Sequence, residues 1–161
     1  MEVLVALAVL SIGLLGMAGM QLYSLKSSHN AYLTSQATNF AYELVDKMRA
    51  NRDQAIAGAY DTDFTSMPGG LLVNCQISNC APQQLAIFEL AQWKCALGSY
   101  EADAACSNNN GLDLNSILPN GDGEVERGNS SRPNLVTVTV RWTERTDNLA
   151  DAEDVMIVAE L

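Results

Sequence analysis

The first group in this chain that could do chemistry is the carboxylate of Glu2, which stands directly before an apolar run from Val3 to Met20. An ionised side chain placed in hydrocarbon costs roughly 2.5 kcal/mol or more, so such a residue usually has a function, most often as one partner of a charge pair. The plain alternative is that Glu2 lies among lipid headgroups as the polar flank of an ordinary anchor. Charge placement alone favours neither interpretation.

Beyond Glu2, the sequence offers no catalytic constellation. His29 is the sole histidine, and it falls on a polar surface of the predicted helix, so a Ser or Cys nucleophile in the C-terminal part has no imidazole base. Glycine-rich phosphate loops and metallopeptidase motifs are absent from the sequence. We therefore expect neither an enzyme nor a cofactor. A periplasmic enzyme on a single-pass anchor is the alternative, and it would need a cluster of perturbed acids in a deep pocket.

Four acidic residues are predicted to lie in turns and could gather around calcium, which binds several oxygen ligands: Asp113, Asp122, Glu124 and Asp151. Their spacing matches no defined calcium loop. The sequence therefore favours solvated acids in turns, and we expect no metal site.

The four cysteines all lie in the C-terminal part, and an even count in an exported domain predicts disulfides. The spacings Cys75-x4-Cys80 and Cys95-x10-Cys106 favour two local loops, although four cysteines allow three pairings. Zinc is a weak alternative, because no Cys-x2-Cys pair occurs and His29 is far away in the sequence. Two bridges would partly compensate for a small core.

Charge is divided unevenly along the 161 residues. Residues 1–53 hold four acidic and four basic side chains, whereas the remainder holds fifteen and five, so the whole net charge of −10 lies in the C-terminal part. An acidic domain disfavours nucleic acid as a partner, since that partner requires a basic surface. It also disfavours binding flat on anionic lipid. The length suits one domain plus one long element.

Residues 1–53 are predicted to form one long helix with two different halves. In residues 1–22 the helix is apolar all round, and 18 residues at about 1.5 Å each reach roughly 27 Å, close to the thickness of a bilayer. A secretory signal peptide is disfavoured, because the run is too long and lacks a basic start. In residues 23–53 one apolar stripe recurs at three- and four-residue steps: Leu33, Ala37, Phe40, Ala41, Leu44 and Met48.

Residues 54–161 are predicted to form a globular head. Gln83 to Leu97 has a helical pattern, and residues 135–142 alternate with period two, so that Val136, Val138, Val140 and Trp142 face the core. Short strands are expected at 123–127 and 154–161. The sequence thus predicts an α+β fold in which the amphipathic helix half crosses a meander of three or four antiparallel strands.

Residues 2–16 resemble the start of a mature type IV pilin, in which an apolar segment carries a Glu at the fifth mature place. The motif Ser-Ile-Gly-Leu-Leu-Gly, at residues 11–16, closes this segment. It is most similar to the same region of the type IV pilus modification proteins, the PilV-type minor pilins. The head resembles that family loosely, through the Trp93 segment, the turn at 118–123 and the late strands. One departure is that Met1 precedes Glu2 directly, without the leader, its Gly and the Phe. We expect that the chain is trimmed or its start codon placed too late; as written, it offers no residue for N-methylation.

The resemblance implies a ladle-shaped pilin fold and a role in assembling a type IV pilus, near its tip. It implies that Glu2 pairs with the N-terminal amine of a neighbouring subunit. Expected partners are other minor pilins, the major pilin, the inner-membrane assembly platform and, before assembly, the lipid bilayer. The expected location is the inner membrane, with the head periplasmic, and then the extracellular pilus. A minor pseudopilin of a type II secretion system is the alternative, since it shares the Glu2 segment.

Overall fold

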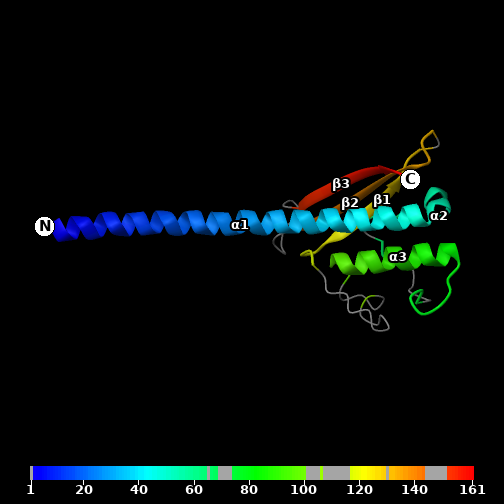
Figure 1. The fold of residues 1–161 in the computed structure, drawn as a ribbon, viewed down its shortest axis with the longest axis horizontal. Helices are drawn as coiled ribbons and strands as arrows, with labels where there is room; N and C mark the ends of the chain where they lie inside the picture. The colour runs from blue at the N-terminus through cyan, green and yellow to red at the C-terminus, as the bar shows by residue number, and fades with distance from the viewer. Residues whose placement is uncertain are drawn as a thin grey trace. The chain divides into compact units, whose positions relative to one another are not determined.

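The computed structural model describes residues 2–64, 66–68, 74–100, 106, 117–129, 131–143 and 152–161. Its elements are α1 (Glu2–Ala50), α2 (Arg52–Ala57), α3 (Pro82–Leu97), β1 (Asp122–Arg127), β2 (Leu135–Thr143) and β3 (Ala152–Glu160) (Figure 1). A long N-terminal helix and a three-stranded antiparallel sheet confirm the predicted α+β, pilin-like fold. By contacts the chain divides into two compact units after Leu33. The division at residues 53 and 54 stays a prediction.

The C-terminal part of α1, from Thr34 onward, packs one face into the second unit. Its buried residues recur at steps of three and four, with Val45 buried beside Leu44: Ala37, Ala41, Leu44, Val45 and Met48. This spacing follows from the 3.6-residue turn and matches the predicted stripe, although Phe40 is only half-buried. The helix stops at Asn51, whose backbone leaves helical geometry and whose Nδ2 donates to Pro82 O at 2.8 Å. Asn51 thus ties the end of α1 to the start of α3.

The sheet has the order β1-β2-β3 with both pairings antiparallel. In β2 the predicted alternation is present, because Val136, Val138, Val140 and Trp142 are all at most 2% exposed. The period of two in a strand places these four side chains on one face, which forms the core of the head. The intervening residues, which include Thr137 and Thr139, are half-buried on the other face.

Helix α3 packs against both α1 and β1. Its first turn starts with Pro82, as predicted, and Gln84 Oε1 accepts the N–H of Ala81 at 3.0 Å. The Trp93 indole Nε1 donates to Phe40 O at 3.0 Å, which ties α3 to α1.

Two glycines permit this close packing, Gly121 just before β1 and Gly123 within it. A Cβ on Gly121 would lie 2.3 Å from Leu97 O, and one on Gly123 would lie 2.1 Å from Cη2 of Trp93. Either methyl would therefore force α3 away from the strand. Asn120 adopts a left-handed φ of 49°, which asparagine tolerates better than most residues, and its Nδ2 donates to Thr143 Oγ1 at 3.0 Å.

Candidate functional site

The first unit presents a continuous apolar surface. Every large apolar side chain between Val3 and Met20 is more than half exposed, from 54% at Leu7 to 73% at Leu15. Helix α1 is the one helix among the described residues that is long and apolar enough to cross a membrane, with a mean hydropathy of 2.4 over 18 residues. Water is a poor solvent for such a surface, because each large apolar side chain loses about 1.5–3 kcal/mol by staying exposed. This surface therefore requires lipid or other helices around it.

Glu2 lies in the first turn of α1 and is exposed. The partial positive charge at a helix N-terminus favours a carboxylate in this turn. Three residues farther along the apolar half are glycines, namely Gly13, Gly16 and Gly19, and a Cβ on any of them would meet nothing within 4 Å. The structure thus gives these glycines no packing role within the described residues, which is consistent with a surface that another helix approaches. Ser11 satisfies its hydroxyl inside the helix by donating to Leu7 O at 2.7 Å.

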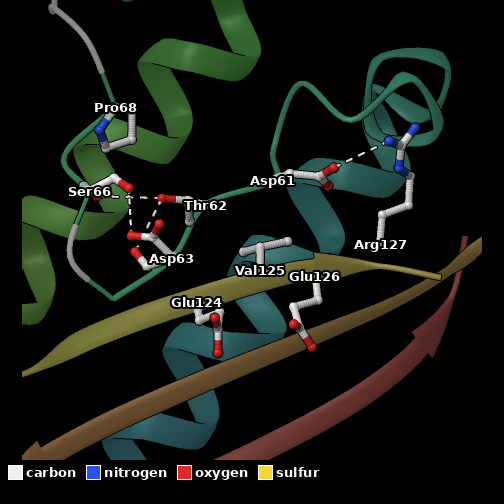
Figure 2. Close-up of a pocket in the computed structure, with 9 residues that line it drawn as sticks. All are labelled: Asp61, Thr62, Asp63, Ser66, Pro68, Glu124, Val125, Glu126 and Arg127. Atoms are coloured by element: carbon white, nitrogen blue, oxygen red, sulfur yellow. Dashed lines mark hydrogen bonds and ion pairs between the residues drawn. The ribbon is translucent and has the colours of Figure 1, made fainter. Parts of the chain in front are cut away.

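In the second unit, an open groove of about 550 Å³ runs beside the outer edge of β1 (Figure 2). The segment after α2 forms its other wall. Four carboxylates and one guanidinium line it: Asp61, Asp63, Glu124, Glu126 and Arg127. Arg127 Nη2 lies 3.4 Å from Asp61 Oδ2, and its Nη1 donates to Ile56 O at 2.7 Å. Arg127 therefore fixes the end of α2 to the strand and partly neutralises an acidic surface.

Two acids of this groove are harder to ionise than usual. Burial raises the pKa of Asp61 above its ordinary value, and the nearby Arg127 offsets only part of that effect. Burial is also the largest cause that raises the pKa of Glu124, followed by repulsion from Glu126 and Asp63. The groove is shallow and open, so these shifts do not amount to the deep acidic pocket that an enzyme on an anchor would need.

A buried ion pair joins α3 to β1. Lys94 has a fully buried side chain, and its Nζ lies 2.8 Å from Asp122 Oδ1 and 2.5 Å from Asp63 O. The Asp122 carboxylate also accepts from Gly123 N at 2.7 Å and from Tyr100 Oη at 3.4 Å. Burial is the main cause that lowers the pKa of Lys94, while the bond to Asp122 acts in the opposite direction. The pair holds three segments together, and it is a structural contact.

The structure corrects the prediction that Asp122 and Glu124 lie in solvated turns. Both belong to β1, and Asp122 is only 7% exposed, because its strand position and Lys94 draw it into the head. Asp113 and Asp151 lie outside the described residues. Within those residues, no group of three or more His, Cys, Asp or Glu side chains is arranged to hold a metal ion.

Two disulfides close short loops in the head. Cys75 is bonded to Cys80 and Cys95 to Cys106, with Cα atoms 5.5 and 5.4 Å apart. These are the two local pairs that the spacing favours. The first bridge closes a loop just before α3, and the second anchors residue 106 to the buried side of α3 at Cys95, which is 2% exposed.

Residues 19–91 match the family described as Tt1218-like, type IV pilin Tt1218. Over this segment, which is just under half of the chain, the protein is similar to type IV pilins. The matched segment starts near the end of the apolar run and reaches into α3. It therefore does not overlap residues 2–16, whose sequence resembles the start of a pilin. Two separate segments of this pilin-like chain thus indicate the same class of protein. No curated protein and no solved structure gave a significant match.

The similarity directs attention to contact surfaces, and the exposed apolar side chains of α1 form the largest one among the described residues. Pilins are generally non-enzymatic, and they act by assembling with other pilins into a fibre that starts from the membrane. Sequence reasoning singled out Glu2 and the apolar run but missed Lys94. The helical period did carry a signal, since Lys94 lies four residues after Leu90 and three before Leu97, both buried.

Proposed function

We propose that this chain is a minor pilin that promotes assembly of a type IV pilus from a position near its tip. The observation that carries the proposal is the apolar part of α1, which follows Glu2 and leaves every large apolar side chain from Val3 to Met20 exposed. Before assembly, the bilayer would cover this surface, with the head on the periplasmic side. After assembly, the apolar helices of other minor pilins and of the major pilin would replace the lipid.

Glu2 would set the axial position of the subunit during this exchange. A carboxylate that enters an apolar fibre core needs a counter-charge, and removing one partner of a buried pair costs about 3–5 kcal/mol. The N-terminal amine of a neighbouring subunit would supply that charge at one axial offset only. Glu2 would therefore act as a register device that the inner-membrane assembly platform exploits when it adds a subunit.

The test replaces Glu2 by Ala and by Gln in cells that produce the pilus. We expect both variants to insert into the membrane normally but to be depleted from sheared pili, because neither can neutralise the neighbouring amine. Glu43→Ala is the matched control, since it removes a carboxylate that is half exposed on the same helix and is paired with Lys47. Normal amounts of Glu2→Ala in sheared pili would refute the register role.

A clean deletion distinguishes the pilus from a secretion system. Loss of surface pili with normal secretion of exoproteins is the expected result for a minor pilin. Normal pili with failed secretion would instead assign the chain to the minor pseudopilins of type II secretion.

A further inference from the structure

The main-chain groups at the outer edge of β3 can be assigned from the register of the sheet. In an antiparallel pair, successive residues alternate between bonding to the neighbour and pointing away from it. Leu161 N donates to Asn134 O at 2.8 Å, so the main-chain groups of every second β3 residue counted back from Leu161 bond to β2. These are the odd-numbered residues of the strand. The N–H and C=O groups that point away therefore belong to Ala152, at the start of the strand, and to Asp154, Met156, Val158 and Glu160. The bond from Gly128 N to Leu135 O, at 2.7 Å, shows in the same way which residues of β1 bond to β2. The two assignments agree, because they use alternate residues of β2.

The opposite edge of the sheet shows what an occupied edge looks like in this protein. By the same alternation, Val125 of β1 points outward, and both of its main-chain groups bond to Thr62, with N···O distances of 2.9 and 3.1 Å. The Lys94 ammonium holds the adjacent Asp63 carbonyl, so this covering segment is itself anchored. The chain therefore pairs the middle of the outer edge of β1 with its own backbone.

The edge of β3 has no such cover among the residues that the structure describes, where β2 is the only strand or bridge paired with it. The strand is nine residues long, and the two side chains at the centre of its outer face, Met156 and Val158, are 62% and 56% exposed. Asp154 and Glu160 flank them on the same face. A long edge strand with an apolar centre is a template for a further strand.

We propose that the outer edge of β3 is a docking site for an extended segment of a different protein. That segment would carry apolar residues opposite Met156 and Val158 and basic residues opposite Asp154 and Glu160, because opposite charges across strands stabilise a pair and like charges weaken it. Its main chain would bond to the outward groups of the four β3 residues. The proposal rests on the sheet alone, so it does not depend on the role of Glu2.

A second copy of this chain fits the edge poorly. Antiparallel pairing centred on Ile157 places Asp154 opposite Glu160 of the second copy, and the symmetry repeats that repulsion at the other end. Parallel pairing in register places each acid opposite itself. Both arrangements also bring together two heads that each carry a net charge of −10. Charge thus selects a partner with basic ends.

The test uses the full chain in detergent micelles and a fluorescent peptide, Lys-Thr-Val-Thr-Val-Thr-Lys, with a Glu-ended version as its control. We expect the Lys-ended peptide to bind and to slow hydrogen exchange at the amides of residues 154, 156, 158 and 160. At low salt, the Glu-ended peptide should bind about tenfold more weakly, since both terminal pairs change from attraction to repulsion. Equal binding of both peptides, or binding of neither, would overturn the proposal.

Two double variants locate the binding to the edge. Met156→Lys with Val158→Lys should abolish most binding of the Lys-ended peptide. The control is Thr137→Lys with Thr139→Lys, which adds the same charge to the register partners on β2, on the same face but away from the edge. Equal loss from both double variants would show that general charge, and not the edge, controls binding.

Hydrogen exchange of the free chain supplies an independent criterion. We expect the outward amides of residues 154, 156, 158 and 160 to exchange much faster than those of Val155 and Ile157, which bond to β2. Equally slow exchange at both sets would overturn the proposal, because it would mean that the edge is already occupied. Dependence on protein concentration would then assign the occupant to a second copy, and independence would assign it to another segment of this chain.

Discussion

The two parts of α1 differ in how far their apolar side chains are exposed. Up to Met20, the large apolar residues are all more than half exposed, whereas from Thr34 onward Leu44, Val45 and Met48 have no exposed surface. The same secondary structure thus serves two purposes along one helix. The later part contributes to the stability of the head, and the earlier part keeps its apolar surface for lipid or for other subunits. Four substitutions or treatments would break or sharpen this contrast.

The largest expected loss comes from leaving a charge unpaired inside the head. Lys94→Ala removes the partner of Asp122, so the free energy of unfolding should fall by about 3–5 kcal/mol in a urea titration of the head. Lys47→Ala is the control, because its partner Glu43 is exposed, and it should cost less than about 1 kcal/mol. Equal losses would mean that the head does not bury its charges in solution as the structure shows.

A pair of matched leucine substitutions tests the contrast directly. Leu44→Ala creates a cavity at a fully buried position and should cost about 2–5 kcal/mol of head stability. Leu14→Ala, at a position that is 59% exposed, should change it by less than about 0.5 kcal/mol. Thermal unfolding in micelles measures both. A large effect of Leu14→Ala on the head would show that the two parts of α1 are not energetically separate.

Opening the disulfides should weaken the head and leave the helicity of the apolar part unchanged. In the chain-entropy model each bridge contributes roughly 2–3 kcal/mol, and the longer loop contributes more. Removing Cys95–Cys106, with a sequence separation of 11, should therefore cost more than removing Cys75–Cys80, with a separation of 5. Paired Cys→Ala variants give the two values. Four free thiols in the unreduced, unfolded protein would refute both bridges.

The smallest effect concerns the acidic groove beside β1. Because the pKa of Glu124 is raised in the folded state, the native protein binds more protons than the unfolded chain between the ordinary carboxyl pKa and the raised one. The stability linked to the protonated form is complete below that window and is lost as pH rises through it. Glu124→Gln should thus match the wild type near pH 3 and exceed it by roughly a few tenths of a kcal/mol at pH 7. A variant that is less stable at pH 7 would contradict this sign.

The periodic features of the head followed from the sequence, because burial on one face leaves a pattern in the residues. The alternation of β2 and the apolar spacing around Leu44 are examples, and both match the structure. The burial of Asp122 could not be predicted from the sequence, since an Asp between two glycines usually indicates a turn. Its burial depends on a lysine 28 residues earlier, and such a pairing across the fold leaves no local pattern.

The apolar unit could be located from hydropathy alone, and the structure adds that its surface is uncovered. Glu2 remains a prediction, because its partner would be another subunit. The free edge of β3 could not be predicted, since the strand pattern does not say which neighbour lies on each side. That assignment required the register of the sheet and the bond to Thr62 at the other edge.

Both tryptophans of the chain belong to the head, where Trp93 and Trp142 are each 1% exposed. Their intrinsic fluorescence is therefore an internal reporter of the head alone. Detergent, vesicle or assembled fibre can be exchanged around the apolar helix without changing the surroundings of either indole. One emission spectrum could then follow the same domain from membrane to filament without an added label.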